Sequence, residues 1–94
     1  MLSSGADNLL DCESLEERLR DLIARLARCR KGLIRPTANL REDLGIDSFT
    51  GTEILVAIEN LYDIKIEESE IGKIVSFEDL VNFVHYRMTR RRVR

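Results

Sequence analysis

Residues 43–49 of the chain read DLGIDSF, and a helical pattern of apolar residues follows them directly. Asp47 is a good N-cap residue, because its carboxylate can accept a hydrogen bond from a free N–H group of the first helical turn. Gly45 permits a sharp reversal of the chain just before that cap. We therefore expect Ser48 in the first turn of a helix, with its hydroxyl group open to solvent. This end of a helix carries partial positive charge and free N–H donors, which favour an attached phosphate.

The rest of the sequence indicates a small helical protein. The chain has 94 residues with one proline, no tryptophan, three phenylalanines and two tyrosines. A chain of this length forms one domain with one modest core. No alternating, strand-like run is visible, whereas leucine, isoleucine and valine recur at helical spacing. We predict an all-α fold, a small four-helix bundle with three longer helices and one short one, and a long loop between the first and second helices.

The periodic patterns place these elements along the chain. Ser14 and the glutamates after it form a capping-box pattern for a first helix, which is expected to end near Lys31. A second helix follows Asp47, one helical turn covers residues 67–72, and Ser76 caps the last helix with Asp79 three residues later. The residues predicted to face the core are Leu15, Leu19, Leu22, Ile23, Leu26, Leu33, Ile34, Leu40, Leu44, Ile46, Ile54, Ile58, Leu61, Phe77, Leu80, Val81, Val84 and Met88. We divide the chain into a flexible lead-in (1–13), a helical domain (14–88) and a basic C-terminal tail (89–94).

Charge is partitioned along the chain, although the formal net charge is only −2. Residues 40–80 contain eleven acidic and three basic residues, which leaves this segment with a charge of −8. Residues 87–94 contain five arginines and no acid. The acidic middle favours protein partners with basic surfaces and argues against nucleic acid as the main ligand.

The segment around Ser48 resembles a known family. Residues 44–49, LGIDSF, are similar to the Leu-Gly-x-Asp-Ser-Leu motif of acyl carrier proteins. The similarity continues through residues 53–59 (EILVAIE), 62–66 (YDIKI) and 76–84, and it covers about half of the chain. Thr50 and Gly51 depart from the family pattern, since an acid usually stands at the first of these positions. This departure, together with the basic tail, favours a specialised stand-alone carrier.

The resemblance implies that Ser48 carries a 4'-phosphopantetheine arm, whose thiol holds an acyl group as a thioester, and that Asp47 next to it is also a cofactor-binding residue. It implies a carrier and not an enzyme, working in fatty-acid, polyketide or specialised lipid synthesis in the cytoplasm. The partners implied are a phosphopantetheinyl transferase and acyl-transfer or synthase enzymes with basic docking surfaces. We expect a monomer without stable membrane insertion. A peptidyl or aminoacyl carrier and an unmodified helical interaction module are the alternatives.

Helical geometry separates two faces of the second helix. At about 100° per residue, Ile54, Ile58 and Leu61 share one side, while a mixed apolar and acidic strip lies nearly opposite. Because this strip adjoins Ser48, we interpret it as a docking surface. Scattered apolar surface residues, which need no functional explanation, are the alternative. The strip consists of Phe49, Thr52, Glu53, Val56 and Asn60. The candidate docking residues are Phe49, Thr52, Glu53 and Val56 from this strip, and Glu59 beside it.

No catalytic or metal-binding group is predicted. His85 is a lone histidine next to the apolar stripe of the last helix, with no acid or cysteine near it in sequence to form a relay. Asp43 and Asp47 do not form an EF-hand loop, because the sixth position counted from Asp43 is Ser48 and not glycine. Cys12 and Cys29 are too far apart for metal-ligand spacing and are expected to be reduced thiols. No signal peptide or membrane-spanning run is visible.

Overall fold

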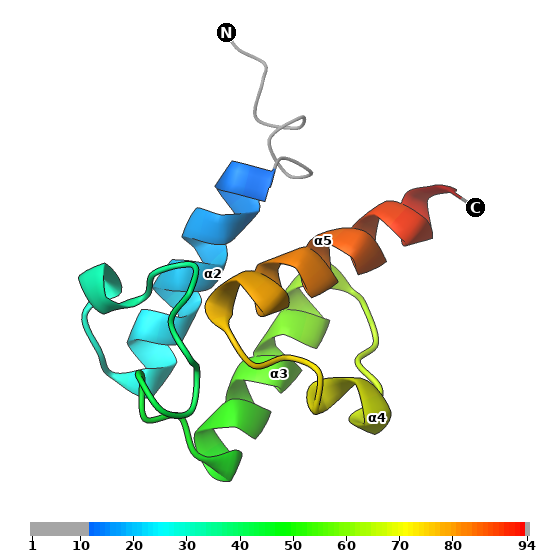
Figure 1. Cartoon of the computed structure of the whole chain (residues 1–94). Coiled ribbons are helices and arrows are strands. Elements are labelled where there is room, and N and C mark those ends of the chain that lie inside the picture. Colours follow the sequence, from blue (N-terminus) through cyan, green and yellow to red (C-terminus); the bar gives the residue numbers. More distant parts are fainter. Residues whose placement is uncertain (1–11, 94) are drawn as a thin grey trace, which may run out of the picture.

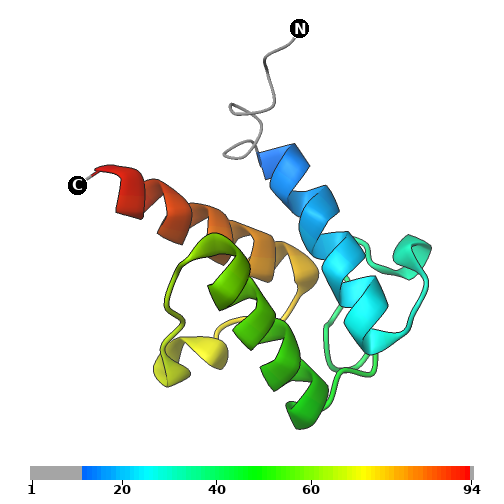
Figure 2. The same ribbon diagram turned by 180° about the vertical axis from the view of Figure 1, so that it is seen from behind.

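The structure, a computed structural model, describes residues 12–93. It contains the helices α2 (Cys12–Ala27), α3 (Ser48–Tyr62), α4 (Glu68–Ile71) and α5 (Phe77–Val93), and a 3-10 helix, η1 (Lys31–Leu33). Within residues 12–93 there is no β-strand, only one isolated bridge between Asn39 and Ser76. The predicted all-α fold with three longer helices and one short helix is confirmed. Figure 1 shows α4 outside α3 and beneath α5, and Figure 2 shows the same arrangement from behind.

The core is formed by one apolar face of each long helix. The predicted stripes of α2 and α5 are confirmed, although Leu26 and Met88 are only half-buried. Each large side chain that is removed from water in this way contributes about 1.5–3 kcal/mol to folding. The buried residues are Leu15, Leu19, Leu22, Ile23, Ile34, Ala38, Leu44, Ile46, Ile54, Ile58, Ile64, Ile66, Phe77, Leu80, Val81 and Val84.

Helix α2 differs from its prediction at both ends. Its backbone is already helical at Cys12, so Ser14 lies inside the helix and the predicted capping box there is wrong. The helix also ends at Ala27, before the predicted end near Lys31. The reason is that Arg28 adopts the left-handed conformation (φ 57°), which lets the Cys29 N–H donate to the Ala24 carbonyl at 3.1 Å. This closure of the last turn is typical of helix C-termini, although glycine is the usual residue there.

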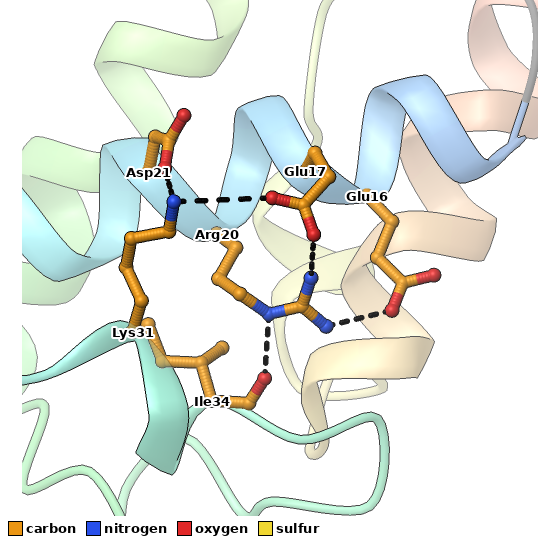
Figure 3. A network of polar contacts seen from close by, with 6 residues as sticks. All are labelled: Glu16, Glu17, Arg20, Asp21, Lys31 and Ile34. Atoms are coloured by element: carbon orange, nitrogen blue, oxygen red, sulfur yellow. Dashed lines mark hydrogen bonds and ion pairs between the residues drawn. The ribbon is translucent and has the colours of Figure 1, made fainter.

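An arginine in the middle of α2 fixes the segment that follows the helix. Arg20 donates through Nε to the carbonyl of Ile34 at 2.8 Å, and its other two nitrogens pair with Glu16 and Glu17 at 2.7 and 2.8 Å (Figure 3). Its guanidinium also lies 5.0 Å from the ring centroid of Phe77, at the start of α5. Arg20 therefore joins α2, the connection after it and α5.

Exposed charged side chains also link α2 to η1. Lys31 in η1 forms an ion pair with Asp21 of α2 at 2.7 Å and approaches Glu17 at 3.9 Å (Figure 3). The hydrogen bond from Lys31 lowers the pKa of Asp21, and the same contact raises the pKa of Lys31.

The connection from α2 to α3 packs onto the core, as its apolar residues predicted. Ile34, Leu44 and Ile46 are buried and Leu40 is half-buried, but Leu33 is 55 % exposed and its predicted burial is wrong. Leu33 is the last residue of η1, which stands at the edge of the fold in Figure 1 and has no buried residue. The core therefore holds this connection through the residues after η1.

The start of α5 pairs with the same connection. The backbone N–H of Leu40 donates to the carbonyl of Val75, and that of Phe77 donates to the carbonyl of Ala38, both at 2.9 Å. Ser76 Oγ accepts from the N–H of Asp79, and Asp79 Oδ2 accepts from the N–H of Ser76 at 3.0 Å, which confirms the predicted cap.

Helices α2 and α5 extend beyond residues 14 and 88, the predicted limits of the helical domain. The predicted lead-in (1–13) lies outside the described residues as far as residue 11, and Cys12 already belongs to α2. Helix α5 continues to Val93, beyond Met88, where the predicted apolar stripe ends. Among the described residues, no helix is both long enough and apolar enough to cross a membrane.

Candidate functional site

The turn in front of α3 has the geometry that residues 43–49 predicted. Gly45 has a φ of 68°, a left-handed conformation that side-chain-bearing residues adopt only at a cost. Leu44 and Ile46, on either side of it, are buried and fix the turn to the core. Asp47 is the N-cap, and its Oδ1 accepts a hydrogen bond from the N–H of Thr50 at 2.8 Å.

The capping contact also affects the charge of Asp47. The hydrogen bond from the Thr50 N–H lowers the pKa of Asp47, because it stabilises the carboxylate form. Asp47 therefore acts in the structure as a charged cap, and this contact sets the direction in which α3 starts.

Side chains upstream complete the turn. Asn39 Oδ1 accepts from the N–H groups of Arg41 and Glu42, at 3.0 and 2.8 Å. Asp43 Oδ2 in turn accepts from the N–H of Asn39 at 2.8 Å. The carboxylate of Asp43, like that of Asp47, therefore accepts a hydrogen bond from a backbone N–H group. No group of histidine, cysteine and acidic residues that could hold a metal ion occurs in the described part of the chain.

Ser48 is the first residue of α3, and its side chain is exposed. Helix α3 has no acidic residue in its first turn, so its N–H groups meet no negative side chain there apart from the cap. Ser48 also lies on the rim of a cavity of about 680 Å³ between α3 and the α4 region. The site thus combines an accessible hydroxyl, a helix N-terminus and an adjacent cavity.

Half of the residues that line the cavity are leucine, isoleucine or valine, and the other half are polar, charged or glycine. Its apolar side chains come from α2, the connection, α3, the α4 region and α5, so all parts of the fold contribute to it. Its lining residues are Ile23, Asn39, Leu40, Arg41, Glu42, Ile46, Asp47, Ser48, Gly51, Thr52, Ile54, Leu55, Glu68, Ile71, Gly72, Ile74, Val75 and Leu80.

The predicted docking strip lies on the exposed side of α3. Phe49 is 72 % exposed and Val56 is 48 % exposed, and Thr52 and Glu53 are exposed as well. Phe49 therefore does not fold back beneath the loop. The structure thus brings an apolar surface and an acid next to Ser48 on one face.

Glu59 is in a different situation from the rest of the candidate docking residues. It is half-buried, and its Oε2 accepts a hydrogen bond from the backbone N–H of Ile66 at 2.8 Å. Ile66 is itself buried. The carboxylate of Glu59 therefore holds the chain that follows α3.

One predicted core residue of α3 is exposed. Ile54 and Ile58 are buried, as the helical spacing predicted, but Leu61 is 64 % exposed and its predicted burial is wrong. Leu61 lies in the last turn of α3, just before Asp63 ends the helix in a left-handed conformation (φ 53°). The core does not extend over this last turn on the side of Leu61.

The two remaining candidate groups stand apart from Ser48. His85 is half-buried in α5, and neither it nor Cys29 lines the cavity beside Ser48. Cys29 is a half-buried free thiol just after α2.

This geometry agrees with a comparison of the chain with protein families. Residues 17–84 match the family model described as a phosphopantetheine attachment site. The chain belongs to this family of carrier proteins, as the resemblance of residues 44–49 indicated. Membership implies a covalently attached 4'-phosphopantetheine group. Domains of this family generally carry bound groups and are not themselves catalysts.

Two features of the site were not predicted from the sequence: the cavity and the contact between α5 and α4. The cavity needs α3 and α4 to be placed relative to each other, and no local pattern encodes that placement. Arg87 of α5 contacts Glu70 of α4, 17 residues earlier, whereas the sequence distinguished it only as one of the five arginines of residues 87–94. A contact across that separation leaves no periodic signal in the sequence.

Proposed function

We propose that Ser48 carries the 4'-phosphopantetheine arm and that the protein presents acyl groups on this arm to partner enzymes. The observation that supports this most directly is the exposed Ser48 hydroxyl, at the first residue of α3 and on the rim of the cavity. When attached, the arm supplies a terminal thiol that holds an acyl group as a thioester. The protein supplies a rigid support and raises the local concentration of the tethered group at each docked enzyme.

Residues around Ser48 suit the phosphate of such an arm. The N-terminal end of α3 offers backbone N–H groups and the positive end of the helix dipole. The Asp47 carboxylate caps this end of α3 by accepting from the N–H of Thr50. Arg41, on the same cavity rim, adds a positive side chain to an otherwise acidic segment. These features favour a serine that carries a phosphodiester over one that only caps a helix.

The exposed strip on α3 supports a docking role. Phe49 and Val56 offer apolar contact area, and Glu53 offers a charge that a basic partner surface would attract. We propose Phe49, Thr52, Glu53 and Val56 as contacts for the transferase and for acyl-handling enzymes. Glu59 lies beside this surface, but its carboxylate accepts a hydrogen bond from the Ile66 N–H, so we propose that it supports the fold there.

The cavity favours an acyl cargo over an aminoacyl or peptidyl one. Nine of its eighteen lining residues are leucine, isoleucine or valine, and these suit an aliphatic chain. A charged aminoacyl group placed against these apolar side chains would lose hydration. We propose a monomeric carrier that acts in the cytoplasm, in fatty-acid, polyketide or another specialised lipid pathway.

The test is the intact mass of the protein after incubation with coenzyme A and a phosphopantetheinyl transferase. We expect the wild-type protein and the control Ser69→Ala, which alters an exposed serine of α4, to gain one phosphopantetheine group. The variant Ser48→Ala should gain none while keeping its helix content. Loading of Ser48→Ala, or no loading of the wild type by several transferases, would contradict the proposal.

A further inference from the structure

Helix α4 is too short to be stable without contacts to other elements. It has four residues, Glu68–Ile71, and none of them is buried. A single helical turn is unstable in isolation, because nucleating it fixes several residues for very few hydrogen bonds. In Figures 1 and 2, α4 stands beside α3 and connects to its neighbours through irregular segments. Contacts with other elements must therefore set the position of α4.

Arg87 of α5 makes three contacts that bear on this position. Its guanidinium forms an ion pair with the carboxylate of Glu70 in α4. It also donates to the backbone carbonyl of Lys65, in the segment that leads into α4. The same group lies 5.1 Å from the ring centroid of Phe83, one turn earlier in α5. Arg87 thus joins α5 to both α4 and the chain just before it.

The partner of Arg87 also starts α4. Glu70 accepts through Oε1 from the backbone N–H of Glu67 at 2.9 Å, which completes the capping box of this helix. Its other oxygen, Oε2, meets Arg87. The capping hydrogen bond and the arginine both lower the pKa of Glu70. The ion pair with Arg87 therefore acts on the residue that defines the first turn of α4.

Helix α4 forms one side of the cavity next to Ser48. Glu68, Ile71 and Gly72 line it, as do Ile74 and Val75 directly after the helix. The opposite side is α3. A displacement of α4 away from α3 would change the width of the cavity without changing the turn that presents Ser48.

We propose that Arg87 is a positioning residue that holds α4 against the cavity and so determines which acyl groups the carrier shelters. The part of this inference that concerns cargo rests on the proposed role of Ser48. The part that concerns α4 does not, because it can be measured on the unmodified protein.

The first experiment measures amide hydrogen exchange in the unmodified protein. Arg87→Gln removes the ion pair and should accelerate exchange at Glu70, Lys73 and Ile74, whose amides bond within the α4 region, by about fivefold or more. Amides in α2 should keep their wild-type rates. Arg87→Lys keeps the charge but cannot bond two acceptors with one planar group. Its exchange rates in α4 should therefore lie between those of the wild type and those of Arg87→Gln. Arg30→Gln, which removes an exposed positive charge after α2, is the matched control and should change nothing in α4.

A second variant covers the case in which Arg87→Gln loosens the whole domain. Glu70→Gln leaves Arg87 on the Lys65 carbonyl and keeps an oxygen for the Glu67 N–H, so it removes only the ion pair. It should accelerate the same α4 amides. Wild-type exchange rates in α4 for both variants would overturn the proposal, and so would an increase that is equal in α2 and α4.

The third measurement uses protein loaded with an acetyl or a longer saturated acyl group. Hydroxylamine cleaves thioesters, and a sheltered acyl group should react more slowly than acetyl. In Arg87→Gln we expect this protection of the longer group to be lost, while the acetyl group reacts at its wild-type rate. Unchanged protection in Arg87→Gln would show that Arg87 does not determine the cargo. Failure of the wild type to load would instead contradict the role of Ser48 and leave the exchange result intact.

Discussion

The carboxylate of Glu59 accepts a hydrogen bond from the backbone N–H of Ile66, seven residues further along the chain, at 2.8 Å. This contact connects the last turns of α3 to the segment that enters α4. Glu53, nearly two turns earlier on the same helix, is exposed. Glu53 and Glu59 thus lie in different surroundings on one helix. Substituting each of them separately can distinguish an effect on docking from an effect on stability.

We predict that Glu53→Lys and Val56→Asp each slow loading by a phosphopantetheinyl transferase and leave the melting temperature nearly unchanged. Both side chains are exposed, and such substitutions change stability by about 0.5 kcal/mol or less. Loading rates at low and moderate salt provide the measurement, and added salt should reduce the difference between Glu53→Lys and wild type. Wild-type rates for both variants, with no effect of salt, would exclude electrostatic docking through this strip.

The matched variant for that experiment is Glu59→Ala. It leaves the N–H of the buried Ile66 without its acceptor, so we expect a loss of stability of about 1 kcal/mol. Thermal unfolding monitored by circular dichroism provides the measurement. A stable Glu59→Ala protein that loads slowly would place Glu59 among the docking contacts instead.

Gly45 and Gly51 should respond in opposite directions to the same substitution. Gly51→Ala should stabilise the protein by about 0.5–1 kcal/mol, because alanine favours the helix and its Cβ would lie in ordinary contact, 3.6 Å from Ile46 Cγ2. Gly45→Ala should destabilise it by about 1–2 kcal/mol, because the φ of 68° disfavours any side chain. Urea unfolding of both variants measures the two effects. A destabilised Gly51→Ala protein would show that the first turn of α3 has no room for a methyl group.

Burial at the two ends of α3 can be tested in the same way. Ile58→Ala should cost about 2–5 kcal/mol, because Ile58 is fully buried. Leu61→Ala should cost about 0.5 kcal/mol or less, because Leu61 is 64 % exposed. If Ile58→Ala and Leu61→Ala lost the same stability in chemical denaturation, Leu61 would have to be buried in the core.

The cap of α5 predicts a pH dependence. Hydrogen bonds from the Ser76 and Val75 N–H groups lower the pKa of Asp79. Its carboxylate therefore contributes stability above the unfolded pKa of about 3.9, and this contribution is lost as the pH falls through the lower, folded pKa. We expect Asp79→Asn to lose stability at pH 7 and to show a weaker decline between about pH 5 and pH 2 than wild type. Parallel stability curves for the two proteins in acid would contradict this role of Asp79.

The sequence predicted the local parts of the site and missed those that depend on tertiary structure. Gly45, Asp47 and Ser48 lie within four residues, so turn and cap chemistry predicts their local conformation. The position of Leu61 depends on where the core ends, which helical spacing does not contain. Arg28 ends α2 in a left-handed conformation without the glycine that usually signals such an end.

Long-range contacts explain the remaining differences. Arg20 reaches Ile34, and Arg87 reaches Glu70 and Lys65, across 14, 17 and 22 residues. Arginines in a charged sequence are indistinguishable from solvated ones until the fold brings their partners close. The cavity beside Ser48 was missed for the same reason, since five segments of the chain contribute to its walls.

The bridge between Asn39 and Ser76 has a consequence for the order of folding. Asn39 organises the turn before Ser48, and its backbone neighbours Ala38 and Leu40 are bonded to the segment at the start of α5. Contacts between residues so distant in sequence form only after the chain has closed a long loop. An unfolded or truncated chain therefore contains the residues of the motif without the turn that presents its serine. The exposed position of Ser48 at the start of α3 is therefore a property of the completed domain.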